Sequence, residues 1–204
     1  MMKDDEIICE VIRHKEATIA WFGQPGKQER ERFILRGFLR CLELTFELQE
    51  IKSVKDEFPD VEFHGAKFEI KEMLDPDRRR HDEYKDALKK LKKTKNISSQ
   101  IQAYQPVFVR FNEVGQRIEP VLNDLCRKYP EHQRASTNLL IYFNLQDVML
   151  DKKTWEPITL NSRGWRSVSV VGSSWCYVFA ASMEAPQFIT ENVSRFRQKM
   201  GLWN

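Results

Sequence analysis

Apolar residues recur every three or four positions in several stretches of the chain, and this spacing predicts helices. The expected helices cover about residues 4 to 22, 27 to 44, 82 to 95 and 115 to 129. The sequence GQPG at 23 to 26 separates the first two, because glycine and proline interrupt helices. Pro186 is expected to open a last helix that runs toward Met200.

Runs of apolar and β-branched residues predict strands between these helices. They are TFELQEIKS at 45 to 53, TNLLIYFNL at 137 to 145, RSVSVVG at 166 to 172 and SWCYVFAA at 174 to 181. Residues 96 to 114 show no clear period. The order predicts one α/β domain over residues 1–204, with a mixed central sheet flanked by helices. Within it, residues 1–25 form an N-terminal helical extension, 27–95 a core helix, a hairpin and a basic helix, and 96–204 the remaining sheet and helices.

The stretch FPDVEFHGAKFEIKEM, residues 58 to 73, alternates charged and apolar residues and predicts a β-hairpin. A two-residue turn at His64 and Gly65 suits the positive φ angles of such turns, since glycine tolerates them and histidine is enriched there. This turn sets the register, which pairs Phe63 with Ala66, Glu62 with Lys67, Val61 with Phe68 and Asp60 with Glu69. Opposed side chains share a face, so one face carries Asp60, Glu62, Lys67, Glu69 and Lys71, and the other is apolar.

Asp60 and Glu69 then place two like charges opposite each other, which destabilises a sheet unless something compensates. A divalent cation is one compensation, because Mg²⁺ takes a few carboxylate oxygens and keeps several waters. The Ile70 carbonyl is a candidate third ligand, and Lys71 can position the attacking water or offset charge on a phosphate. The nearby lysines are the other compensation. On this pattern alone, a solvated hairpin face is favoured over a metal site.

Composition excludes several classes of protein. The net charge is only +3, and 41% of the residues are hydrophobic, so a sizeable core is expected and no partner follows from charge alone. The four cysteines have no C-x-x-C spacing and the four histidines no zinc-ligand spacing. There is no P-loop and no apolar run long enough to span a bilayer. The start of the chain lacks the form of a signal peptide, so a soluble cytoplasmic protein is expected.

Pro59-Asp60, followed after a short turn by Glu69-Ile70-Lys71, resembles the motif of the PD-(D/E)xK nuclease superfamily. In that superfamily the aspartate begins one strand, the acid-x-lysine triplet lies on the next, and a preceding helix often adds a glutamate. The resemblance implies a restriction-endonuclease-like fold with Asp60, Glu69 and Lys71 as the catalytic core.

The preceding helix, KQERERFILRGFL, offers Glu31 and Glu29 as candidates for that additional glutamate. Glu31 is favoured because it shares the inward face of the helix with Ile34, Leu35 and Phe38.

A second, wider resemblance rests on several segments of the chain. They are KQERERF, FPDVEF, KFEIKEMLDPDRRRHDEYKDAL, and GWRSVSVVG followed by APQF. These segments are similar to a bacterial family of uncharacterised proteins described as endonucleases by inference from the motif. The resemblance implies Mg²⁺ or Mn²⁺, held by Asp60, Glu69 and the Ile70 carbonyl, for phosphodiester hydrolysis. The implied partner is nucleic acid, with DNA favoured. No membrane partner is expected, and a homodimer stays open.

Basic residues follow the motif between positions 78 and 95. They can hold a phosphate backbone, or they can form a solvated helix face, and the two interpretations weigh about equally. The candidates for nucleic-acid contact are Arg78, Arg79, Lys89, Lys92 and, further along, Arg166. The neighbouring Trp165 is expected to pack in the core. The alternative to an enzyme is a non-catalytic nucleic-acid-binding or partner-binding protein on the same fold, and metal dependence separates the two.

Overall fold

The computed structural model describes residues 4–75, 80–93, 105–145, 148–151, 153 and 155–203, which divide into two compact units. The first unit comprises Met1–Arg30 and Asp75–Gln105, and the second comprises Glu31–Leu74 and Pro106–Asn204. Helix α2 (Lys27–Cys41) begins in the first unit and continues in the second. It ends three residues before the predicted end, where Glu43 adopts a left-handed φ of 62°.

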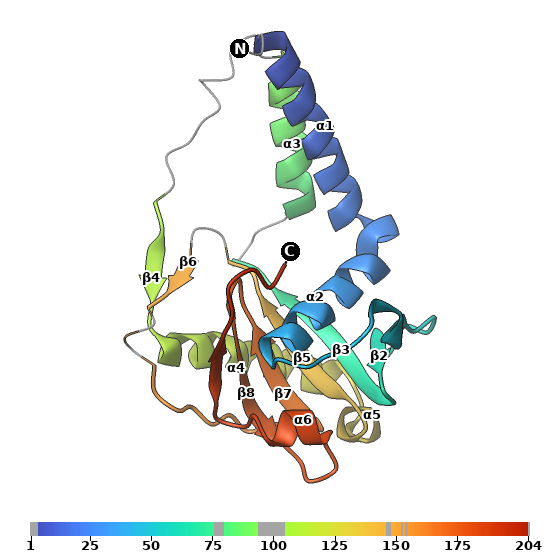
Figure 1. Cartoon of the computed structure of the whole chain (residues 1–204), viewed down its shortest axis with the longest axis vertical. Helices are drawn as coiled ribbons and strands as arrows, with labels where there is room; N and C mark the ends of the chain where they lie inside the picture. Colours follow the sequence, from blue (N-terminus) through green and yellow to red (C-terminus); the bar gives the residue numbers. More distant parts are fainter. Residues whose placement is uncertain are drawn as a thin grey trace. The chain divides into compact units, whose positions relative to one another are not determined.

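The first unit is a pair of helices, as the apolar spacing predicted. Helix α1 (Asp4–Phe22) and helix α3 (Arg80–Lys93) run side by side in opposite directions (Figure 1). A short 3₁₀ helix, η1 (Gln24–Gly26), follows α1. The Phe22 and Tyr84 rings stack with centroids 5.5 Å apart, and Lys92 forms an ion pair of 2.7 Å with Glu16. No helix among the described residues is long and apolar enough to cross a membrane.

The second unit contains a seven-stranded mixed sheet, which confirms the predicted fold class. Its order is β1 (Ile51–Ser53), β2 (Val61–Phe63), β3 (Ala66–Met73), β5 (Asn138–Phe143), β7 (Ser167–Val171), β8 (Trp175–Ala181) and β9 (Phe196–Gln198). The central pairs β3–β5 and β5–β7 are parallel, and the other pairs are antiparallel. Two further strands, β4 (Val107–Val109) and β6 (Val148–Leu150), form a separate parallel ribbon.

Helices cover both faces of this sheet. Residues of α2 from Ile34 on pack with Phe68 and Ile70 on one face, whereas α4 (Phe111–Lys128) packs with Leu139 and Ile141 on the other. Side chains alternate along a strand, so neighbouring residues belong to different cores. The short helices η2 (Leu48–Glu50), α5 (Glu131–Ala135) and α6 (Gln187–Thr190) connect the larger elements.

The prediction of a helix from Pro186 toward Met200 is wrong beyond the end of α6 at Thr190. The chain turns at Ser194, whose φ of 58° is left-handed, and residues 196–198 add β9 to the sheet. Phe196 stacks on Trp175 with ring centroids 5.9 Å apart, so aromatic packing outweighs the weak helical pattern. The strand expected over residues 45–53 is also shorter, because η2 occupies its centre and only Ile51–Ser53 pairs with β2.

Candidate active site

The hairpin of β2 and β3 has the register that its sequence predicts. Val61 pairs with Phe68, Glu62 with Lys67 and Phe63 with Ala66. His64 and Gly65 form the turn with φ angles of 48° and 76°, the positive values that a type I′ turn requires.

The regular ladder ends at Val61, and Asp60 is fixed to β3 in a different way. Its backbone N–H donates to the Phe68 carbonyl at 3.0 Å, while its carboxylate oxygen Oδ2 accepts a hydrogen bond of 2.9 Å from the Ile70 N–H. Asp60 therefore holds both its backbone and its side chain against β3, beside the position of Glu69.

The Asp60 and Glu69 carboxylates are buried, unlike the charged side chain of Lys67 nearer the turn of the hairpin. Asp60 is 5% exposed and Glu69 only 1%, whereas Lys67 on the same face is exposed. The face is therefore not a solvated one at these two positions. Burial arises because β5 pairs with β3 alongside Glu69, and because the end of α4 covers this part of the sheet.

Tyr129 and Lys71 contact the same oxygen of Glu69. The Tyr129 hydroxyl donates to Oε1 at 2.5 Å, and the Lys71 ammonium lies 3.1 Å from Oε1. The other carboxylate oxygen, Oε2, is buried and has no hydrogen-bond partner among the described residues. The Tyr129 ring packs against Phe58 and Trp165, with centroids 4.7 and 5.7 Å away. Glu69 is thus held firmly at one oxygen and unsatisfied at the other.

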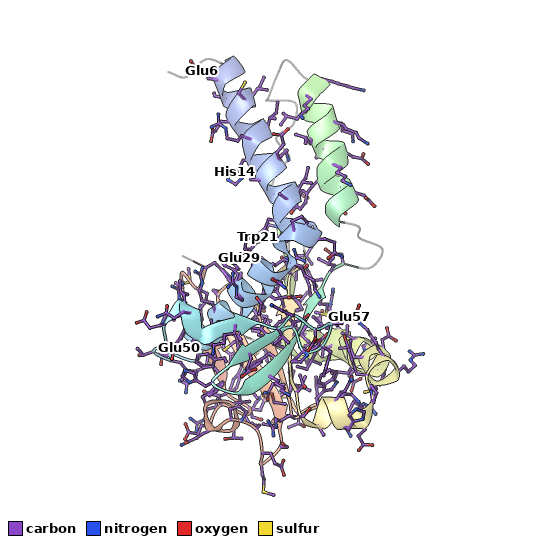
Figure 2. The ribbon with its side chains drawn as sticks, turned by 90° about the vertical axis from the view of Figure 1, so that its right-hand side faces the viewer. Glu6, His14, Trp21, Glu29, Glu50 and Glu57 are labelled. Carbon is purple, nitrogen blue, oxygen red and sulfur yellow. The ribbon has the colours of Figure 1, made fainter. Side chains whose placement is uncertain are left out.

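The electrostatics of the site favour a proton or a cation at Glu69. Burial raises the pKa of Glu69, and the Asp60 charge raises it further, while Tyr129 and Lys71 act in the opposite direction. The pKa of Tyr129 is also raised, first by burial and then by the hydrogen bond to Glu69. Glu57, on the loop that leads into β2 (Figure 2), adds a further negative charge near Tyr129. The Tyr129 phenol therefore stays protonated and remains a donor.

The donor set limits the kind of metal site that these residues can form. Across the described part of the chain, no group of three or more His, Cys, Asp or Glu side chains is arranged to hold an ion. Two carboxylates still suit Mg²⁺, which keeps several of its waters and uses few protein ligands. The unpartnered Oε2 of Glu69 fits such an ion, because it lacks the partner that a buried carboxylate oxygen normally has.

The two candidate glutamates of the preceding helix lie in different settings on α2. Glu31 is buried on α2, which packs against the face of the sheet that carries Phe68 and Ile70. Glu69 points to the opposite face, where Tyr129 lies. Glu29 is exposed and belongs to the first unit (Figure 2).

The predicted nucleic-acid contacts that the structure describes belong to different units, with Lys89 and Lys92 in the first and Arg166 in the second. Lys89 and Lys92 are exposed on α3 and form ion pairs with Asp86 and Glu16. Such pairing is typical of a solvated helix face. Arg78 and Arg79 lie outside the described residues.

Arg166 is half-buried in the second unit, and its backbone N–H donates to the carbonyls of Arg134 and Thr137. Trp165 is 2% exposed, so its predicted role in packing is confirmed.

Sequence reasoning missed Tyr129. It ends α4, it is 60 positions from Glu69, and no local pattern joins the two. Its only signal is its position at a helix end, before Pro130.

Tyr129→Phe is expected to destabilise the protein more at pH 8 than at pH 5. The hydroxyl lowers the pKa of Glu69, so its loss leaves the ionised carboxylate with one partner fewer and costs about 1–3 kcal/mol. Below the pKa of Glu69 the carboxyl is protonated, and the cost is smaller. Urea denaturation at both pH values measures the difference. Tyr84→Phe, in which the ring can still stack on Phe22, is the control. An equal loss of stability at both pH values would contradict the electrostatic role.

The fold and this cluster define an α/β protein that carries a buried carboxylate pair and a lysine on one hairpin of a seven-stranded mixed sheet. The chain belongs to the family described as "Putative endonuclease, protein of unknown function (DUF1780)", whose family model matches residues 3–202. The predicted resemblance to an uncharacterised endonuclease family is thereby confirmed.

A solved structure from Pseudomonas aeruginosa strain PAO1 has a similar fold. It is described as a protein of unknown function of the monooxygenase superfamily, and it matches with a TM-score of 0.66 and 23% sequence identity over 100% of both chains. At this identity the likeness supports the fold alone. No curated protein matches the chain.

Proposed function

We propose that this protein is a metal-dependent nuclease of the PD-(D/E)xK type, which hydrolyses phosphodiester bonds of DNA at Asp60, Glu69 and Lys71. One observation carries the proposal: Oε2 of Glu69 is buried beside the Asp60 charge and lacks a hydrogen-bond partner among the described residues. Leaving such an atom unsatisfied costs about 1–3 kcal/mol or more. A cation shared with Asp60 would remove this cost. The family description agrees with the proposed activity.

Asp60 and Glu69 would hold the ion, with the Ile70 carbonyl as the predicted third ligand. When bound, Mg²⁺ or Mn²⁺ polarises a phosphate, lowers the pKa of a water molecule and stabilises the leaving oxygen. Hydrogen bonds within the protein hold both carboxylates in fixed orientations. The Ile70 N–H fixes Oδ2 of Asp60, and the Tyr129 hydroxyl fixes Oε1 of Glu69. Hydrogen bonds of this kind orient metal ligands and tune their affinity.

Lys71 would supply a positive charge to the phosphate group that is cleaved. Its ammonium is held 3.1 Å from Oε1 of Glu69, yet its side chain is 30% exposed. It can therefore reach a phosphate from the solvent side while Glu69 keeps it in place. A charge-assisted hydrogen bond from Nζ would offset the negative charge that develops on the phosphate oxygens. Lys128, whose ammonium lies 4.7 Å from the Tyr129 ring centre, adds a second cation nearby.

The test is metal-dependent cleavage of labelled single- and double-stranded DNA and RNA. Wild-type protein is expected to cleave DNA with Mg²⁺ or Mn²⁺ and to stop in EDTA. Glu69→Gln removes a metal ligand and is expected to lower the rate by at least about 100-fold. Glu62→Gln is the matched control, because Glu62 lies on the same face of the hairpin, opposite Lys67.

The same experiment separates the enzyme from the non-catalytic alternative. If wild-type protein cleaves no substrate at any metal concentration, the nuclease proposal is wrong. If Glu69→Gln cleaves as fast as wild type, the active site lies elsewhere in the protein.

A further inference from the structure

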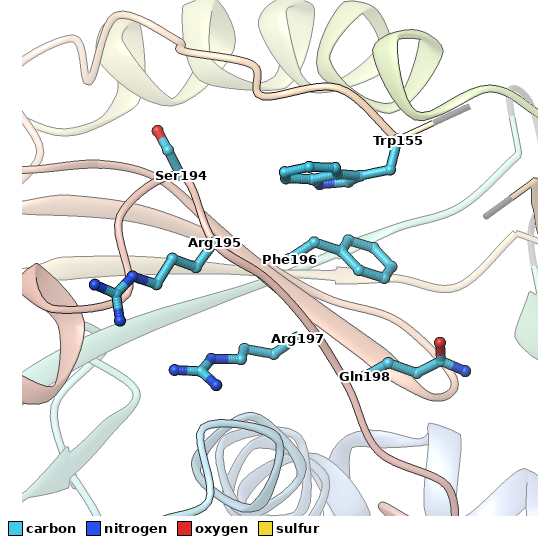
Figure 3. A pocket seen from close by; sticks show the side chains of 6 residues that line it. All are labelled: Trp155, Ser194, Arg195, Phe196, Arg197 and Gln198. Atoms are coloured by element: carbon cyan, nitrogen blue, oxygen red, sulfur yellow. The ribbon is translucent and has the colours of Figure 1, made fainter. Parts of the chain in front are cut away.

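A pocket of about 580 Å³ follows β9, the strand at one border of the sheet. Four steps of the sheet order separate β9 from β3, which at about 4.8 Å per step is about 19 Å. The pocket is therefore separate from the carboxylate pair. Its walls are formed by Trp155, Ser194, Arg195, Phe196, Arg197 and Gln198 (Figure 3). Because residues 194–198 are consecutive, both faces of one strand line this pocket.

The backbone of β9 has unused hydrogen-bonding groups on its outer side. In an antiparallel pair, successive residues direct their N–H and C=O groups alternately toward the partner strand and away from it. The Lys199 N–H donates to the Ser174 carbonyl at 2.9 Å, so Arg197, two residues earlier, also faces β8. Phe196 and Gln198 therefore direct their backbone groups away from β8, where no described residue bonds to them. Such an edge is a template for another strand.

Side chains of this segment project from both faces of the sheet (Figure 3). Phe196 packs with the core on the α4 side, and its ring centroid is 6.4 Å from that of Trp155, which is 37% exposed. Arg197 pairs with Cys176, which belongs to the core on the α2 side, and Arg195 extends in the same direction as Arg197. Alternate side chains of an added strand would meet an aromatic surface on one face and two arginines on the other.

The two arginines select the kind of strand that can pair here. Arg195 is exposed, and Nε of Arg197 donates to Oδ1 of Asn192 at 2.9 Å, a neutral partner. Within the described ranges, no acidic residue lines the pocket. Opposed residues share a face, so a second copy of β9 would place arginines opposite arginines, which destabilises a sheet. Carboxylates would instead form charge-assisted hydrogen bonds with these guanidinium groups.

We propose that β9 is a docking edge for an extended segment of another protein, in which acidic residues alternate with apolar residues. The segment adds a strand to the sheet and hydrogen-bonds to the backbone of Phe196 and Gln198. Its acids meet Arg195 and Arg197, and its apolar side chains meet Trp155. Main-chain hydrogen bonds give strand addition its affinity, and alternate side chains give it specificity. This docking does not depend on the proposed nuclease function.

The test is binding of a fluorescein-labelled peptide, Glu-Val-Glu-Phe-Glu-Val-Glu, measured by fluorescence anisotropy in EDTA. The matched control peptide has lysine in place of each glutamate. The glutamate peptide is expected to bind wild-type protein at least about 10-fold more tightly, because its carboxylates face the arginines. Equal affinity for the two peptides, or no binding of the glutamate peptide, would overturn the proposal.

Methylation of the peptide backbone tests strand pairing separately from charge. In an added strand, only every second peptide N–H faces β9. One peptide therefore carries N-methyl groups at its valines and phenylalanine, and another carries them at its inner glutamates. One of the two is expected to lose binding by at least about 10-fold, since several hydrogen bonds are lost, and the other to stay within about twofold. Equal affinities would show that the peptide is not held as a strand and would overturn the proposal.

Two protein variants test the two components of the edge. Gln198→Pro removes an outward N–H and is expected to weaken binding by at least about 10-fold, while edge strands tolerate proline where the N–H faces solvent. Arg195→Glu is expected to weaken binding of the glutamate peptide by about 3- to 30-fold. Arg127→Glu, at an exposed arginine on α4, is the matched control and should leave the affinity unchanged. Near-ultraviolet circular dichroism checks that each variant is folded, and unchanged affinity of folded Arg195→Glu would contradict the charge match.

The mass in solution distinguishes a foreign segment from a second copy. Light scattering after size exclusion is expected to give the same mass for wild type and Gln198→Pro. A wild-type dimer that Gln198→Pro converts into a monomer would assign the edge to self-association and overturn the proposal. Each of these measurements is made without metal or nucleic acid, so its outcome is independent of whether the protein cleaves DNA.

Discussion

Lys71→Ala is expected to lower the rate of metal-dependent DNA cleavage by about 100- to 1000-fold. The ammonium lies 3.1 Å from Glu69 and is the charged group of the hairpin best placed to meet a phosphate. A preorganised charge that meets developing negative charge contributes about this much to a rate. Single-turnover cleavage of a labelled duplex, with Mg²⁺ and enzyme in excess, measures the chemical step directly.

Lys67→Ala is the matched control for Lys71. Lys67 lies on the same strand and the same face, but it is exposed and pairs with Glu62 rather than with the carboxylate pair. Its loss should leave the rate within about twofold of wild type. Lys71→Arg keeps the charge and is expected to retain more activity than Lys71→Ala. Equal rates for Lys71→Ala and Lys67→Ala would remove Lys71 from the mechanism.

Glu69→Gln is expected to make the metal-free protein more stable at pH 8 by about 1–3 kcal/mol, the cost of an ionised and incompletely satisfied buried carboxylate. The folded state raises the pKa of Glu69 above its value in the unfolded chain. The stability linked to this group is therefore complete below the unfolded pKa, and it is lost as the pH rises through the folded pKa. Glutamine does not ionise, so the variant lacks this loss.

Urea denaturation from pH 4 to pH 8 in EDTA measures this difference. The wild type should lose stability relative to Glu69→Gln as the pH rises, while Glu62→Gln should follow the wild type. Adding Mg²⁺ at pH 8 should stabilise the wild type and leave Glu69→Gln almost unchanged, because only the wild type offers the carboxylate ligand. If the free energy of unfolding changed with pH in the same way for wild type and Glu69→Gln, burial of this carboxylate would carry no electrostatic cost.

The hairpin could be predicted from sequence because its determinants are local. Strict alternation assigns the faces, and His64-Gly65 sets the register, so Glu69 and Lys71 fall on one face without further information. Burial of that face could not be predicted in the same way. It depends on β5 and on Tyr129, which reach Glu69 from distant parts of the chain.

Helix faces are less informative than strand faces for placing a side chain relative to a sheet. The apolar stripe of α2 correctly predicted that Glu31 is buried. It could not show which side of the sheet the helix covers, and Glu69 lies on the opposite side. Likewise, β9 was missed because three residues make too short a pattern, and their place depends on Trp175 and Phe111.

The contact between Tyr129 and Glu69 also has a consequence for synthesis of the protein. The carboxylates leave the ribosome about 60 residues ahead of Tyr129, and β5 follows it. At roughly 5–20 residues per second, completing the chain from the hairpin to the end of β5 takes roughly 4–14 s. During that interval Glu69 lacks the contacts with Tyr129 and β5 that surround it in the finished protein. The buried setting of Glu69 therefore exists only in a chain that extends past β5, and a shorter nascent chain lacks it.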